Sequence, residues 1–346
     1  MTPDFIREAL RQVKYPGFSR DIVSFGLVKG VEVTANGVEV KIEIQTRDPD
    51  IPEKLFKDCH AILDELPDIG AVKVEIEVKD PPGSTNVAGT GKSSIPGVKR
   101  IIAVASGKGG VGKSTVAANL AVALSKTGAR VGLCDCDLYG PSVAMMFGTA
   151  ERPMSNDQDE IIPVEAHGLQ LMSMGFLLED RSPVIVRGPM ATRYTQQFLR
   201  QVAWENLDYL ILDLPPGTGD IQLTIVQTVS VDGTIIVTTP QEVALTDARK
   251  AISMFAKVNV PILGLIENMS WFDCDHGQRY FLFGEGGGVR EAEKLNVPLL
   301  GQIPINPETR ERADSGNPVA LLDPGNNPVA DAFHQIAAEI RKRVSV

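Results

Sequence analysis

The sequence predicts an α/β protein in which a doubly wound, mainly parallel sheet domain follows a small α+β domain. Two observations predict the larger domain. A short apolar run at residues 101–105 leads directly into a glycine-rich loop and then into an apolar helical segment. A second apolar run, at residues 208–213, ends in an aspartate, at the sheet edge where such folds bind ligands. Alternating hydrophobic residues before residue 80 predict the smaller domain.

The composition is that of an ordinary globular protein. The chain has 346 residues, 43% of them hydrophobic and 23% charged, and this length favours two domains. A stretch rich in Pro, Gly and Ser at residues 80–97 is expected to be a flexible linker between a small domain at residues 1–79 and a larger one at residues 98–346. The net charge of −10 argues against nonspecific nucleic-acid binding. No apolar run has the length of a membrane span, and the N-terminus lacks a signal-peptide pattern, so we expect no membrane association.

The small domain is predicted from residues 1–79. Helices are expected to start near Thr2 and at Pro52, because Thr caps helices and Pro fits their first turn. Residues 31–44 alternate as a hairpin around an Asn-Gly turn, and residues 72–78 alternate as a third strand. The predicted order is helix, strand, strand, helix, strand, and these residues contain no catalytic set.

The four cysteines are too scattered for a disulfide framework, so we expect a reducing compartment, the cytoplasm. Cys59 lies on the apolar stripe of the second predicted helix, which favours a packed core thiol. Cys134 and Cys136 form C-x-C, which is either a weak metal signal or the continuation of an apolar strand.

The glycine-rich loop matches the phosphate-binding P-loop pattern G-x-x-x-x-G-K-[ST]. Its glycines let backbone N–H groups close around phosphate oxygens, and the helix that follows points its positive end at the anion. Lys113 is expected to reach the β- and γ-phosphates, and the Ser114 hydroxyl suits Mg²⁺. The expected nucleotide contacts are Gly107, Lys108, Gly109, Gly110, Val111, Gly112, Lys113, Ser114 and Thr115.

Acidic residues follow the next strands of the predicted sheet. Asp213 ends the apolar run at residues 208–213 in the Walker B pattern and is expected to hold Mg²⁺ directly or through water. Asp135 and Asp137 end another strand, where they are either ligand-binding carboxylates or polar caps of the loop.

The rest of the chain continues the alternation of strands and helices. Further strands are expected at residues 169–174, 233–237, 262–267 and 299–303, and helices at residues 244–257, 327–343 and ending near residue 202. The last helix has an apolar face and a basic end, which suits either domain packing or a membrane surface; its many alanines favour packing.

These motifs resemble the deviant P-loop ATPases, the group that contains nitrogenase iron protein and the Min and Par positioning ATPases. The signature is a second lysine early in the loop, Lys108. The resemblance implies that Lys108 crosses a homodimer interface to the partner's nucleotide, that Asp137 orients the attacking water, and that Asp135 supports Mg²⁺. Lys108, Lys113 and Asp137 are therefore the expected catalytic residues for Mg²⁺-dependent ATP hydrolysis.

Two later segments resemble further parts of this group. The sequence Leu-Pro-Pro-Gly-Thr-Gly-Asp after Asp213 resembles the switch that reads the γ-phosphate, which implies a backbone N–H contact from Gly217. The sequence Glu-Asn-Met around Asn268 resembles the turn that reads adenine, since an amide offers both a donor and an acceptor. The alternative for Asn268 is a local turn bond.

Over nearly its whole length the chain resembles the Mrp/ApbC iron–sulfur carrier ATPases, and its small domain resembles one found beside iron–sulfur assembly proteins. The resemblance implies a homodimer that binds ATP and transfers an iron–sulfur cluster to apoprotein clients, with assembly proteins as further partners. Two alternatives stay open. One is an ATP-gated adaptor without a cluster, and the other is a positioning ATPase similar to MinD and ParA that cycles on membrane or DNA.

One segment departs from the carrier pattern. The carriers have C-x-x-C after the adenine-reading turn, whereas residues 270–288 contain Cys274 alone, followed by Asp275 and His276. Two Cys274 thiolates across a twofold axis would hold a labile cluster, expected to be of the 4Fe–4S type, if outside thiols complete the set or if a turn lets His276 join. Alternatively, Cys274 and His276 are structural residues without a metal.

Overall fold

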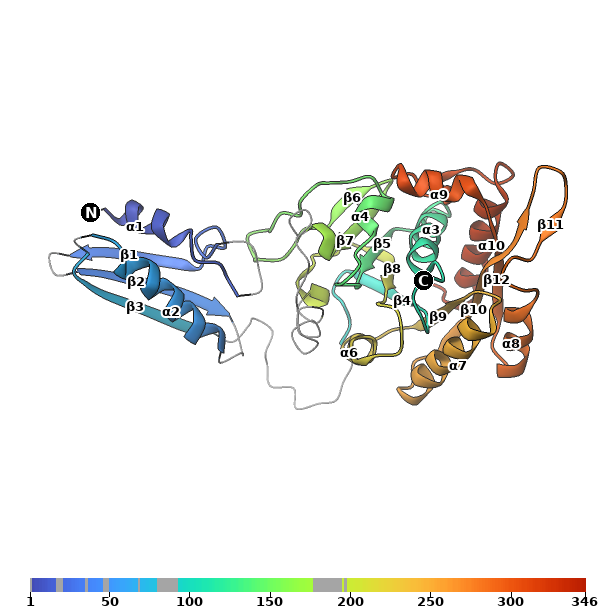
Figure 1. Cartoon of the computed structure of the whole chain (residues 1–346), viewed down its shortest axis with the longest axis horizontal. Coiled ribbons are helices and arrows are strands. Elements are labelled where there is room, and N and C mark those ends of the chain that lie inside the picture. The colour runs from blue at the N-terminus through green and yellow to red at the C-terminus, as the bar shows by residue number, and fades with distance from the viewer. Residues whose placement is uncertain are drawn as a thin grey trace. The chain divides into compact units, whose positions relative to one another are not determined.

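The computed structural model describes residues 2–16, 21–34, 37–45, 50–67, 69–79, 93–176, 195 and 198–346. The chain divides into two compact units, Met1–Thr90 and Gly91–Val346 (Figure 1). Most of the expected linker, residues 80–92, lies outside the described residues. Residues 93–97 do not fit the linker prediction, because they pack on the second unit. The Ser93 backbone bonds to Thr228 and Ser230 at 3.1 and 2.9 Å, and Ile95 is buried in that unit's core.

The first unit is a three-stranded sheet with two helices. Its elements are α1 (Pro3–Leu10), β1 (Val28–Thr34), β2 (Gly37–Gln45), α2 (Asp50–Asp64) and β3 (Ala71–Lys79). β2 pairs antiparallel with β1 and parallel with β3, and the order of elements is the predicted one. Ala35 and Asn36 of the expected Asn-Gly turn lie outside the described residues. Cys59 is fully buried and burial raises its pKa to about 12, which confirms the packed core thiol.

The second unit is built on a mainly parallel sheet. Its strands are β4 (Val98–Ala105), β5 (Val131–Asp135), β6 (Val164–Ala166), β7 (Leu169–Ser173), β8 (Leu207–Asp213), β9 (Gly233–Thr238), β10 (Ile262–Asp273), β11 (Arg279–Tyr280) and β12 (Leu299–Ile305). They lie in the order β11-β10-β9-β4-β8-β5-β7-β6, and β12 pairs with β10. Only β6 and β11 are antiparallel to their neighbours in this described part of the chain.

Helices cover both faces of this sheet, as the sequence predicted. They are α3 (Lys113–Ser125), α4 (Val143–Met146), α6 (Asp220–Thr228), α7 (Glu242–Lys257), α8 (Gly287–Leu295), α9 (Pro307–Asp314) and α10 (Pro328–Arg343), with the 3₁₀ turns η1 (Met174–Phe176) and η2 (Val319–Leu321). Figure 1 shows α3 and α10 on one face and α7 and α8 on the other. α3 has apolar residues all round because it is buried between strands and α10.

The structure describes α10 in full but only the end of the helix expected near residue 202. The apolar side of α10, including Phe333, Ile336 and Ile340, is buried, which confirms that this helix packs on its own domain. The helix expected to end near residue 202 falls largely outside the described residues, although residues 198–201 are helical. Within the described ranges, no helix combines the length and the apolar composition that crossing a membrane requires.

Candidate functional site

The phosphate loop joins β4 to α3 and depends on its glycines. Gly110 and Gly112 have φ angles of 82° and 81°, in the left-handed region that side chains disfavour. A Cβ at Gly107 would clash with the carbonyl of Asp247 on α7, so this position also requires glycine. Among the described residues no side chain caps the start of α3, and its first N–H groups therefore suit an anion.

The adjacent lysine and serine of the loop place two polar groups beside the end of β8. Lys113 is only 6% exposed, its ammonium pairs with the Asp213 carboxylate, and it donates to Ser114 Oγ at 3.1 Å. Asp213 is fully buried, and its second oxygen, Oδ2, has no hydrogen-bond partner among the described residues. Burial raises the pKa of Asp213, and the Lys113 charge partly opposes this. An unsatisfied carboxylate oxygen near a serine hydroxyl is a set that fits Mg²⁺.

Asp135 is tied to the protein by four hydrogen bonds. Its carboxylate accepts the backbone N–H groups of Asp137, Ser142 and Val143 at 3.1, 2.9 and 3.3 Å, and the Ser173 hydroxyl at 3.0 Å. Burial, together with the nearby Asp213 charge, raises the pKa of Asp135 to about 6. In this state Asp135 therefore anchors the loop after β5, which is the cap alternative that the sequence left open.

Asp137 also caps its own loop. It is half-buried, and its Oδ1 accepts the N–H groups of Tyr139 and Gly140, both at 3.2 Å. The neighbouring thiols of Cys134 and Cys136 are buried with their sulfurs 3.8 Å apart, and contact with Cys134 and burial raise the pKa of Cys136. Across the described residues, no group of three or more His, Cys, Asp or Glu side chains is arranged to hold a metal ion. Both cysteines belong to the buried hydrophobic core of this unit, as the strand interpretation of the C-x-C pair predicts.

The predicted γ-phosphate switch lies against the phosphate loop. The Gly217 N–H donates to the carbonyl of Ser106 at 3.0 Å, so it must leave that carbonyl before it can bind a phosphate oxygen. The Ser106 hydroxyl in turn donates to the Lys108 carbonyl at 2.9 Å. Lys108 itself is half-buried, and its ammonium makes no ion pair with another residue of the described ranges.

Asn268 meets the phosphate loop from the other side. Its amide Nδ2 donates to the Val111 carbonyl at 2.9 Å, and a Cβ on Gly112 would clash with the same nitrogen. The structure therefore brings together the loop, Lys113, Asp213 and Asn268, all at the carboxyl ends of parallel strands.

The segment with Cys274 forms a hairpin that the sequence did not predict. β10 runs on to Asp273 and pairs with β11, so that Asp273 lies opposite Arg279. Cys274 lies in the turn, where its carbonyl accepts the Gly277 N–H and its N–H donates to the Gln278 carbonyl, both at 2.9 Å. Cys274 is half-buried, and His276 is exposed in the same turn. The turn that a His276 role requires is therefore present.

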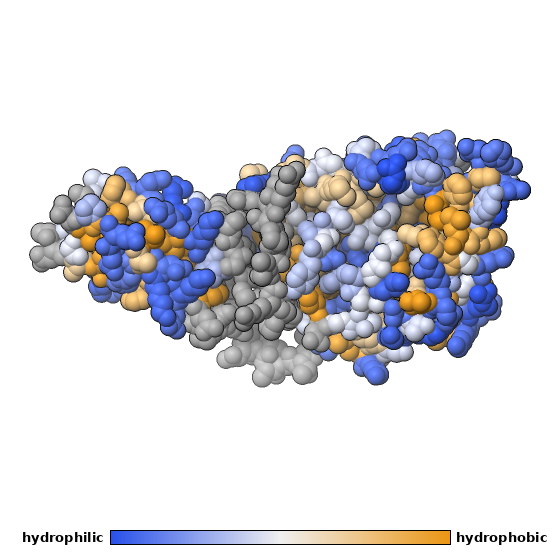
Figure 2. All heavy atoms as spheres, in the orientation of Figure 1, coloured by the Kyte–Doolittle hydropathy of each residue, from blue (hydrophilic) through white to orange (hydrophobic). Residues whose placement is uncertain are grey.

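The two sides of the hairpin carry different side chains. On one side the Arg279 guanidinium makes two bonds to Asp273, at 2.7 and 2.9 Å, and stacks 4.4 Å from the centre of the Trp271 ring. Phe272 and Tyr280 lie opposite each other on the other side, and Tyr280 is 45% exposed. Figure 2 shows hydrophobic surface on the visible face of this unit, in the part of the view where Figure 1 draws α10 and β12.

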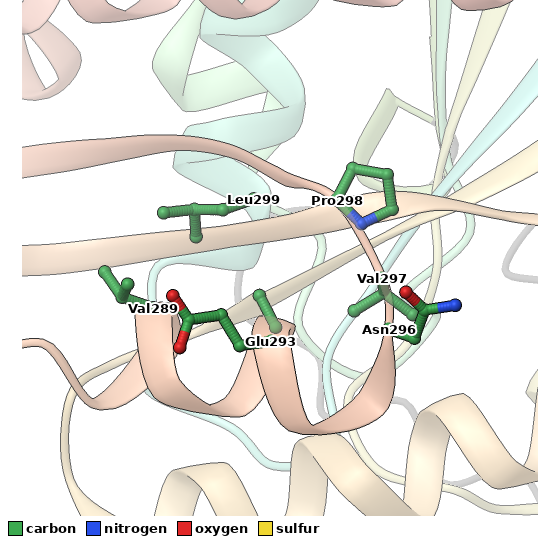
Figure 3. A pocket seen from close by; sticks show the side chains of 7 residues that line it. Val289, Glu293, Asn296, Val297, Pro298 and Leu299 are labelled. Atoms are coloured by element: carbon green, nitrogen blue, oxygen red, sulfur yellow. The ribbon is translucent and has the colours of Figure 1, made fainter.

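A separate groove of about 380 Å³ lies between α8 and β12 (Figure 3). Its lining is mostly apolar, with the Glu293 carboxylate and the Asn296 amide as its polar side chains. A negative carboxylate and no cation disfavour a polyphosphate, so this groove is not the nucleotide site.

Family models match the residues of both units of the chain. A family model described as NUBPL iron-transfer P-loop NTPase matches residues 97–341, and one described as iron–sulfur cluster assembly protein matches residues 3–76. An iron–sulfur cluster carrier protein of Deinococcus radiodurans is 44% identical over 345 residues, which cover 99% of this chain and 96% of that protein.

Solved structures resemble the second unit. A nucleotide-binding protein of Archaeoglobus fulgidus, in complex with ADP, is 40% identical with a TM-score of 0.57, covering 63% of this chain and 87% of that chain. The cell division ATPase MinD of Pyrococcus furiosus is 26% identical with a TM-score of 0.55, covering 71% of this chain and 99% of that chain. These similarities confirm the predicted fold and the predicted resemblance.

Proposed function

Because the chain belongs to the family of NUBPL iron-transfer P-loop NTPases, we propose that it is an ATP-hydrolysing carrier that binds an iron–sulfur cluster and passes it to apoproteins. One observation carries this proposal: a single strand, β10, contributes Asn268 to the phosphate loop and ends directly before Cys274, the one thiol that is not fully buried. The relative from Deinococcus radiodurans that matches the whole chain is named an iron–sulfur cluster carrier. We place the protein in the cytoplasm, where thiols stay reduced.

The proposed nucleotide chemistry begins with an exchange of partners. Lys113 leaves Asp213 and binds the β- and γ-phosphates, while Asp213 and the Ser114 hydroxyl hold Mg²⁺. When bound, the ion would neutralise charge on the phosphates. Asn268 binds the adenine edge, and the phosphates lie on the N–H groups of residues 107–115.

Hydrolysis requires two further residues in the proposed homodimer. Lys108 reaches the partner's nucleotide. Its ammonium is available for this contact because it makes no ion pair in the described part of the chain. Asp137 orients the attacking water, and its loop is held in place by Asp135. The Gly217 N–H binds the γ-phosphate after it releases the Ser106 carbonyl.

The cluster is cargo, and this chain alone cannot ligate it. Four ligands, commonly thiolates, hold such clusters, whereas each chain offers Cys274, with His276 in the same turn. A twofold axis doubles this set, so we propose a labile cluster, of the 4Fe–4S type, between two Cys274 thiolates, completed by His276 or by an outside thiol such as that of a client. Weak ligation suits a carrier that must release its cargo.

The test is anaerobic reconstitution with iron and sulfide, measured by visible absorption and by iron per dimer. The parent is compared with Cys274→Ala and with Asp275→Ala, a matched change in the same exposed turn. We expect iron in the parent and in Asp275→Ala, and a loss of most iron in Cys274→Ala. Equal iron in all three proteins would contradict the assignment of Cys274. No iron in the parent would favour the second candidate function, an ATP-gated adaptor, which the single cysteine also suggests.

A further inference from the structure

Strand β10 connects the phosphate loop physically to the hairpin that carries Cys274. The strand pairs with β9 as far as Glu267, which lies opposite Thr238. The buried Glu267 carboxylate accepts the Gly288 N–H at the start of α8 and the Gln302 amide of β12, the latter at 2.7 Å. The strand is therefore firmly held up to the residue before Asn268.

Met269 breaks the regular strand directly after Asn268. Its φ angle is 57°, in the left-handed region that a residue with a Cβ seldom adopts. Successive side chains of a regular strand point to opposite faces. Here both neighbouring side chains reach the same point of the phosphate loop. A Cβ on Gly112 would clash with the Asn268 amide and would lie 3.6 Å from Met269 Cε. The left-handed turn at Met269 thus places both side chains beside Gly112.

The hairpin beyond Met269 is only loosely joined to the sheet. On β10 the chain advances four residues, from Asn268 to Phe272, while β12 advances two, from Ile303 to Ile305. The two additional residues form a bulge. Its inner side is closed by the Ser270 hydroxyl, which donates to the Glu267 carbonyl at 2.8 Å. Past the bulge, the pair Phe272–Ile305 is the one remaining register contact with β12 in the described residues.

We propose that Met269 is a positioning residue that couples nucleotide in the phosphate loop to the exposure of Cys274. When Asn268 turns from the Val111 carbonyl to the nucleotide base, the segment around Met269 loses its hydrogen bond to the loop, and the Met269 side chain beside Gly112 is free to shift. The hairpin pivots at the bulge, because it is held there by few sheet bonds, and the environment of Cys274 changes. This inference rests on the proposed nucleotide binding, and it adds how that binding regulates the thiol.

The experiment measures the rate at which N-ethylmaleimide alkylates Cys274 in cluster-free protein, with and without saturating ADP. Occupancy is established separately by calorimetry. The other three cysteines are buried and serve as internal unreactive controls. Two variants are compared with the parent. Met269→Gly keeps the left-handed turn but removes the side chain beside Gly112, and Met269→Leu keeps an apolar side chain of similar volume there.

In the parent and in Met269→Leu, we expect ADP to change the alkylation rate about fivefold, the low end of ordinary coupling between two sites. In Met269→Gly the rate should be the same with and without ADP, although ADP still binds. An ADP effect of parental size in Met269→Gly would overturn the proposal, as would no effect in a parent that binds ADP. Because the protein carries no cluster in this assay, a failure to reconstitute iron leaves the result unaffected. A carrier without coupling would still load iron.

Discussion

Replacing Lys113 with an apolar residue of similar length tests the central ion pair of the site. In Lys113→Met the Asp213 carboxylate stays fully buried, and its Oδ2 already lacks a partner among the described residues. Removing one partner of a buried ion pair costs about 3–5 kcal/mol, because an uncompensated charge remains. We therefore expect the free energy of unfolding of the second unit to fall by this amount near pH 8.

The cost should depend on pH in a known direction. Burial already raises the pKa of Asp213, and loss of the Lys113 charge raises it further. A carboxyl group whose pKa is higher in the folded than in the unfolded chain binds more protons when folded, so the folded state loses stability as the pH rises between the two values. The variant should therefore approach the parent at low pH and fall behind it by at most about 1.4 kcal/mol per pH unit above the unfolded pKa.

The assay is urea unfolding followed by tryptophan fluorescence at several pH values. Both tryptophans, Trp204 and Trp271, lie in the second unit, so the signal reports that unit alone. The double variant Lys113→Met, Asp213→Asn removes both charges and should recover most of the stability. A single-variant loss below about 1 kcal/mol that does not change with pH would refute the reasoning, since this is the range of an exposed pair.

Two further predictions concern turnover and thiol access. Lys108→Ala and Asp137→Ala should each bind ATP with parental affinity by calorimetry, yet lose about 100-fold or more of phosphate release, because their proposed contacts arise at the closed dimer and at the water. Parental turnover in Lys108→Ala would remove the cross-subunit role. In the native protein a chromogenic disulfide should titrate one thiol per chain, Cys274, and the other three only after unfolding, since Cys59, for example, is buried with its pKa raised to about 12. A second fast-reacting thiol would contradict the described burial.

The parts of the site that could be predicted are those whose position is set by residues nearby in the sequence. The phosphate loop is one contiguous motif, and a strand before it and a helix after it are enough to place it. Asp213 is the last residue of β8, and Asn268 lies in β10 directly after its last pair with β9. The edge that they share could therefore be predicted from the parallel order of these strands. What these residues contact in this state could not be predicted in the same way.

The unpredicted parts depend on partners far away in the sequence. Asp135 accepts the hydroxyl of Ser173, which lies 38 residues further on, and nothing near Asp135 indicates that bond. β10 extends past residue 267 because Asp273 pairs with Arg279 and because Phe272 meets β12. The left-handed turn at Met269 has no sequence signal at all, since methionine is not a residue that favours it.

The groups that would bind nucleotide are, in this state, bound to one another. Lys113 pairs with Asp213, the Asn268 amide with the Val111 carbonyl, and the Gly217 N–H with the carbonyl before the loop. If nucleotide binds as proposed, it replaces three internal contacts that tie the loop to β8, β10 and the switch. Part of its binding energy is spent on that exchange, and the same exchange frees three separate elements at once. With the proposed binding, this exchange can change the proposed dimer surface and the cysteine hairpin together, which a rigid phosphate pocket could not do.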